Sequence, residues 1–112
     1  HVTYGLDRLN AETSAWMRGA GASPELLHLP DSPVWTRVYS APGKEPACAV
    51  LDEALAAMGA KRMVVGHTVH TEGIQSACDD RIWMIDVGLA KYYQGPTQVL
   101  EIRGDAVTVL KG

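Results

Sequence analysis

The chain has 112 residues, of which 46% are hydrophobic and 21% charged, and its formal net charge is −3. This length allows one domain with a core of moderate size, and the composition is ordinary for a globular protein. The negative charge disfavours nucleic acid and anionic membranes as partners, because both attract clustered Lys and Arg. No segment reaches the ~20 consecutive apolar residues that a membrane-spanning helix needs.

The first part of the chain, residues 1–45, is expected to combine helices with loops. Apolar residues at helical spacing predict a helix over Tyr4–Arg18, which Gly19 ends. A connection rich in Gly and Pro follows, in which Ser23-Pro24-Glu25 is expected to start one short helical turn. The stretch VWTRVYS, residues 34–40, lies close to prolines on both sides and is predicted to be extended or loop.

The second part, residues 46–112, is expected to form a helix and a sheet. Pro46 suits the first turn of a helix that runs to Met58, with one apolar stripe and Gly59 as its stop. Four strands are predicted at Arg62–Val65, Asp80–Val87, Gln98–Ile102 and Ala106–Leu110. The turn Arg103-Gly104-Asp105 makes the last two an antiparallel hairpin. The predicted fold class is therefore α/β (α+β), with N-terminal helices packed on a mixed sheet that ends in an antiparallel hairpin.

The two cysteines, Cys48 and Cys78, do not have the spacing of a metal-binding or redox pair. We interpret them as free thiols in a reducing compartment, and we expect a cytoplasmic location. A disulfide between them stays open as the alternative.

Two of the four histidines lie in the stretch KRMVVGHTVHTEG, directly after a short apolar run. His67 follows the predicted strand through Gly66, and ligands of α/β proteins collect at the carboxyl ends of such strands. A neutral imidazole is the commonest metal ligand, so His67 is a candidate ligand. Its alternative is a loop histidine bonded to the backbone. His70 is interpreted as a solvated loop residue.

A resemblance to a known family rests on several motifs in order. The run VVGHT, then Gly73-Ile74, CDDRIWMIDVGLAKYYQG and VLEI resemble the C-terminal part of calcineurin-like metallophosphoesterases, nearest to the bacterial Shewanella-like protein phosphatases. The upstream stretches HVTYGLDRLN and DSPVWTRVYS also resemble such proteins, so the resemblance covers nearly the whole chain. Its strongest part runs from Val64 to Gly95.

The resemblance implies a phosphatase that hydrolyses phosphate esters, phosphoserine and phosphothreonine proteins among them. It implies two divalent metal ions, Mn, Fe or Zn, which neutralise phosphate oxygens and lower the pKa of water. His67 would ligate one of them. Arg37 would clamp the substrate phosphate, since a guanidinium offers two parallel donors. Tyr93 would line the active site, with Tyr92 as the rival if the register slips by one residue.

The sequence also departs from the family pattern. Many members carry Gly-His-x-His, whereas His70 here lies one position later. It is therefore not assigned the role of the second histidine, and it stays a candidate for supporting a metal ligand without binding the metal itself. The D-x-H, G-D-x-x-D and G-N-H-[ED] motifs are absent from these 112 residues. We therefore expect residues 1–112 to be a single C-terminal portion of the phosphatase domain, inactive alone and prone to self-association.

A different class of function stays open beside this one. The chain could be a stand-alone small zinc-binding or structural/interaction domain that uses His67 and His70, with a further ligand such as Cys78. Asp86 could be catalytic, but we predict a structural role for it, because a carboxylate before Gly88 is typical of a turn cap.

Overall fold

A computed structural model describes residues 5–41 and 43–112. The chain divides into two compact units, of which the first ends at Thr36 and the second is Arg37–Gly112. The predicted α/β fold class is confirmed, although the strands form two small sheets where one mixed sheet was expected. Within the described ranges no helix has the length and apolar character needed to cross a membrane.

The first unit contains helix α1, Leu6–Met17, and the 3₁₀ turn η1, Glu25–His28. Its buried cluster joins Leu9 of α1 to Leu26 and Leu27 of η1. The indole of Trp35 donates a hydrogen bond of 2.9 Å to the carbonyl of Leu27, which fixes the following segment to η1. Both predicted helical segments are present; Tyr4, where the first was expected to begin, lies outside the described residues.

Helix α2, Cys48–Met58, begins two residues after Pro46 and ends at Gly59, whose φ of 63° is the left-handed conformation that glycine adopts without penalty. Leu51 and Leu55 project from one face of α2 and are buried together with Ile82. Because this face is apolar, packing it against the sheet removes it from water and holds the helix in place. The predicted packing of this helix on a sheet is confirmed.

The sheet beneath α2 has three strands in the order β1-β3-β2. Strand β1, Met63–Val65, runs parallel to β3, Ile82–Met84, and β2, Gln75–Ala77, pairs with β3 in the antiparallel sense. The sheet is mixed, as predicted. Strand β2 has only three residues and no alternating pattern, which explains why the sequence did not predict it.

Strand β3 is shorter than the predicted Asp80–Val87. Three consecutive residues before it, Cys78, Asp79 and Asp80, have φ between 53° and 60°. This left-handed run makes the sharp reversal from β2 to β3 and excludes those residues from the strand. At its other end, β3 gives way to a turn at Asp86.

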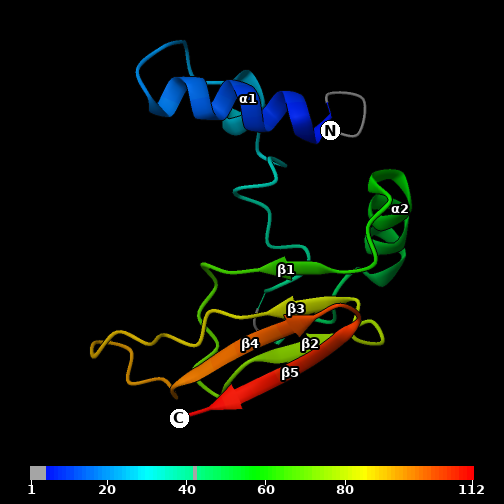
Figure 1. Ribbon diagram of the computed structural model, residues 1–112, viewed down its shortest axis with the longest axis vertical. Helices are drawn as coiled ribbons and strands as arrows, with labels where there is room; N and C mark the ends of the chain where they lie inside the picture. Colours follow the sequence, from blue (N-terminus) through cyan, green and yellow to red (C-terminus); the bar gives the residue numbers. More distant parts are fainter. Residues whose placement is uncertain (1–4, 42) are drawn as a thin grey trace. The chain divides into compact units, whose positions relative to one another are not determined.

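The chain ends in a second sheet, an antiparallel hairpin of β4, Gln98–Arg103, and β5, Ala106–Lys111 (Figure 1). Its two-residue turn contains Gly104 with a φ of 59°, so the predicted hairpin is confirmed. Lys61 and Arg62, just before β1, bind Asp105 at this turn. At the other end of the hairpin, the side chain of Gln98 accepts a hydrogen bond of 2.8 Å from the backbone of Ile74.

The prediction of free thiols is wrong, because Cys48 and Cys78 form a disulfide. Packing of α2 on the sheet brings the first residue of the helix to the turn after β2, with the two Cα atoms 5.5 Å apart. Residues 30 positions apart in sequence thus meet only in the folded chain. An ion pair between Arg81 and Asp52 lies on the same helix and turn.

Candidate functional site

The carboxyl ends of β1 and β3 lie at the same edge of the sheet because the two strands are parallel. The loops that follow them are joined by backbone hydrogen bonds. Ile85 donates to the carbonyl of Val65 at 3.0 Å, and His70 donates to the carbonyl of Asp86 at 2.7 Å. This edge is where α/β folds usually place ligands, and it positions the residues predicted from the sequence.

His67 lies two residues beyond the end of β1 and is exposed. Its φ of 67° is in the left-handed region, which costs a non-glycine residue on the order of 1 kcal/mol. Such conformations persist where the surrounding structure fixes them, and they concentrate at functional sites. The loop therefore holds this imidazole outward from the carboxyl end of a buried strand.

Arg37 begins a turn. Its backbone carbonyl accepts hydrogen bonds from the backbone N–H groups of Ser40 and Ala41, at 3.1 and 3.0 Å. Tyr39 packs against the core under α2, and burial raises the pKa of its phenol, which therefore stays protonated. The hydroxyl of buried Ser40 is hydrogen-bonded to that of Thr68 at 3.0 Å. The turn carrying exposed Arg37 is thus attached to the residue that follows His67.

Tyr93 lies in a loop that closes on itself, since the backbone of Gly95 donates to the carbonyl of Gly88 at 3.1 Å. A Cβ on Gly88 would lie 2.6 Å from the Cβ of Tyr93 and 2.9 Å from a methyl of Val69. Gly88 therefore leaves the space in which Tyr93 packs beside the His67 loop. Tyr92 is 87% exposed and contacts Tyr93 edge to face, so of the two tyrosines it is Tyr93 that packs against this edge.

Three predicted residues, Arg37, His67 and Tyr93, are therefore carried by three segments that meet around residues 66–70. Within the described residues, no hydrogen bond or ion pair joins their side chains directly to one another. Their common edge is built by neighbours that the sequence analysis did not identify, above all Ser40 and Gly88. Only the glycine spacing in the loop could have signalled such close packing.

Asp86 has the structural role predicted for it. Its carboxylate accepts a hydrogen bond of 3.0 Å from the backbone of Gly88 and so caps the turn after β3. His70, in contrast, is not the solvated residue that was expected. The residue is only 9% exposed, and its Nε2 atom is buried without a hydrogen-bond partner.

The described residues do not complete the metal site that the resemblance implies. Among them, no three His, Cys, Asp or Glu side chains lie close enough together to hold an ion. His67 can supply one imidazole, but a pair of metals needs further ligands. The alternative zinc site is also unsupported, since Cys78 is held in a disulfide and its sulfur is not a thiolate.

Comparison with known proteins relates this chain to a protein phosphatase. The chain is 38% identical over 112 residues to a protein of Arabidopsis thaliana described as Shewanella-like protein phosphatase 2. The similarity covers 95% of this chain but 29% of the Arabidopsis protein. The chain therefore spans less than a third of the length of that relative.

A second similar protein carries no functional description. It is an uncharacterized protein of Schizosaccharomyces pombe, 38% identical over 72 residues, which cover 64% of this chain and 22% of that protein. No family model matches the chain. No solved structure matches it either.

Proposed function

We propose that this chain is the C-terminal portion of a calcineurin-like, two-metal phosphatase, and that the edge formed by β1 and β3 is part of its phosphate-ester site. The activity would belong to the full-length protein, and the 112 residues alone would be inactive. The relationship to a protein phosphatase supports the reaction class, and it points to phosphoproteins as substrates.

The observation that carries the proposal is the attachment of two segments, the Arg37 turn and the Tyr93 loop, to the loop that carries His67. The hydrogen bond between Ser40 and Thr68 holds the Arg37 turn beside His67. Packing at Gly88 holds Tyr93 beside the same loop through Val69. A cationic guanidinium, an imidazole and a phenol at one exposed edge are groups that can surround a phosphate ester.

Each side chain would have its own role. Arg37 would donate two parallel hydrogen bonds to phosphate oxygens, orienting the ester and neutralising negative charge. Tyr93 would donate its hydroxyl to the phosphate or pack along the substrate. His67 would be a ligand of one metal, and the remaining ligands would come from sequence outside these 112 residues.

Two divalent ions, Mn, Fe or Zn, are the proposed cofactors, and they would supply charge neutralisation and an activated water. The bacterial and cytoplasmic setting stays a prediction. Disulfides are rare in the cytosol, so the Cys48–Cys78 bond weighs against a cytoplasmic location. Self-association also stays a prediction, which the molecular mass in solution would check.

The test is release of inorganic phosphate from phosphopeptides and an aryl phosphate by the full-length protein. We expect hydrolysis that a chelator abolishes and that a divalent metal restores. His67→Ala should abolish it as well, because one metal loses a ligand. Glu53→Gln, at an exposed position on α2, is the matched control and should hydrolyse at the unaltered rate. Hydrolysis that survives both chelation and His67→Ala would refute the proposal.

A further inference from the structure

An open pocket of about 740 Å³ lies beside the candidate site and is lined in part by His70. His70 is the only histidine among the buried polar residues of the described chain, and its Nε2 has no partner in the fold. A buried polar atom left without a partner costs free energy, on the order of 1–3 kcal/mol. Such an atom beside a pocket is accounted for when a ligand or water completes its hydrogen bond.

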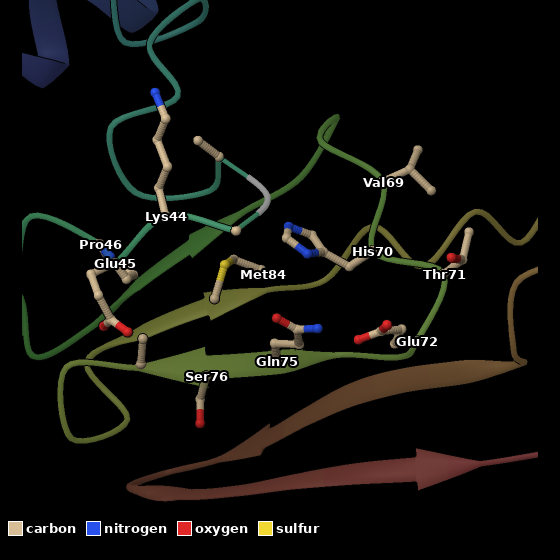
Figure 2. A pocket seen from close by; sticks show the side chains of 13 residues that line it. Lys44, Glu45, Pro46, Val69, His70, Thr71, Glu72, Gln75, Ser76 and Met84 are labelled. Atoms are coloured by element: carbon tan, nitrogen blue, oxygen red, sulfur yellow. The ribbon is translucent and has the colours of Figure 1, made fainter.

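The side chains around His70 combine hydrogen-bond acceptors with one apolar group. Figure 2 shows the His70 ring turned toward the side chains of Met84 and Gln75, with the Glu72 carboxylate on the same side as Gln75. The amino group of Lys44 points away from these residues. The imidazole, the amide oxygen and the carboxylate can all accept hydrogen bonds, and the thioether of Met84 offers apolar contact.

The charge of the pocket favours a cation. Two carboxylates, Glu45 and Glu72, line it, and neither makes an ion pair within the described residues. The one lysine of the lining, Lys44, points outward. A ligand with a positively charged head and an apolar stem would satisfy Glu72 and His70 while its stem lies on Met84.

The pocket is continuous in sequence with the candidate phosphate-ester site. Its lining residues 43–46 follow the Arg37 turn, and its lining residues 69–72 follow His67. The hydrogen bond between Ser40 and Thr68 joins the two segments between the site and the pocket. A peptide whose phosphorylated residue contacts Arg37 would therefore pass close to the pocket with a neighbouring side chain.

We propose that this pocket binds the basic side chain of a peptide, with arginine preferred. A guanidinium has five donors in a planar fork, which suits three acceptors, whereas an ammonium has three donors on one atom. One part of this proposal rests on the proposed function: the peptide would be a phosphorylated substrate with a basic residue near its phosphate. Binding of the side chain itself does not depend on catalysis.

The test is an NMR titration of the isotope-labelled protein with a blocked, unphosphorylated arginine tripeptide. We expect shifts of the His70, Glu72 and Gln75 resonances. The same peptide with citrulline, a neutral isostere of arginine, should cause none. Equal shifts with citrulline, or none at those three residues with arginine, would overturn the proposal. Agmatine, a free alkyl guanidine, should bind more weakly than the peptide, and tighter binding would overturn the assignment to a peptide.

Two variants with opposite expected effects sharpen the test. Glu72→Gln should weaken arginine binding by roughly 1.5- to fivefold, the range for an exposed ion pair, and Gln75→Glu should strengthen it by a similar factor. The control Glu53→Gln keeps the same change of net charge as Glu72→Gln and should not alter binding. An equal loss in both Gln variants would show a general charge effect and overturn the site. Arginine binding without phosphatase activity would refute only the proposed function, and activity without arginine binding would refute only the pocket.

Discussion

The two ends of strands β1 and β3 are built by different means. At the amino end of β3, a disulfide and an ion pair bind α2 to the turn after β2, and the buried leucines of α2 lie on Ile82. At the carboxyl end, backbone hydrogen bonds and close packing at Gly88 hold loops in which exposed His67 lies near buried Val87 and His70. The difference teaches that the covalent cross-link lies away from the candidate site, whose loops are held by hydrogen bonds and packing and leave His67 exposed to meet a ligand.

Breaking the stabilised end should have the largest effect. The double variant Cys48→Ser, Cys78→Ser removes a cross-link between residues 30 positions apart, which should lower the free energy of unfolding by about 3–4 kcal/mol. Urea unfolding of the variant and of the reduced wild-type protein measures the loss. The free energy of unfolding should fall by the same amount in the double variant and in the reduced wild-type protein. Unaltered stability in either would show that the cross-link does not carry this end of the sheet.

The carboxyl end has its own most sensitive position, Gly95. A Cβ there would lie 1.6 Å from the carbonyl oxygen of Val87, so the backbone must move. Gly95→Ala should cost about 2 kcal/mol and displace Tyr93, which NMR of the tyrosine ring would detect. Gly66→Ala is the control, because a Cβ there meets nothing within 4 Å. Equal effects of the two substitutions would contradict the close packing of this loop.

A smaller effect should separate the backbone of His67 from its imidazole. His67→Gly and His67→Ala both remove the ring, and both should abolish the proposed activity. Since the φ of 67° suits glycine, His67→Gly should be more stable than His67→Ala by about 1 kcal/mol. Thermal unfolding of the pair gives the difference. An Ala variant as stable as the Gly variant would mean that the loop relaxes and that His67 is not held in place.

The smallest expected effect is at the hairpin turn, on the fully exposed Asp105. The hydrogen bond and the charge of Lys61 lower the pKa of Asp105 below its ordinary value of 3.8. Its ionised form therefore stabilises the fold above that value, and this contribution is lost as the pH falls through the lowered pKa. Lys61→Met should reduce the acid dependence of unfolding in that range. If the pH dependence of unfolding were unchanged in this variant, the Lys61–Asp105 pair would contribute nothing to stability.

Much of the fold could be predicted from local patterns. The apolar stripe of α2, with Gly59 as its stop, and the two strands flanking Gly104 are periodic signals that tertiary packing did not override. Strand β2 could not be predicted, because three residues are too few to show a periodicity of their own. The disulfide was an open alternative that local sequence could not decide, because Cys48 and Cys78 approach each other only once α2 packs on the sheet.

The candidate site was predictable only as separate residues. His67 was marked by its place after a strand, and Arg37 and Tyr93 by family resemblance alone. Their attachment to one edge depends on contacts such as Ser40 with Thr68, between residues 28 positions apart, which no local pattern specifies. Burial of His70 was unpredictable in the same way, since its loop reads as polar and solvated.

The central claim is that Arg37 binds the phosphate of an ester beside His67. The most direct measurement is kcat/KM for a phosphopeptide with full-length protein carrying Arg37→Lys, which keeps the charge but loses the paired donors. Loss of one charged hydrogen bond predicts a decrease of roughly 10- to 100-fold, with stability unaltered. A kcat/KM equal to that of the wild-type protein would contradict the placement of phosphate at this edge.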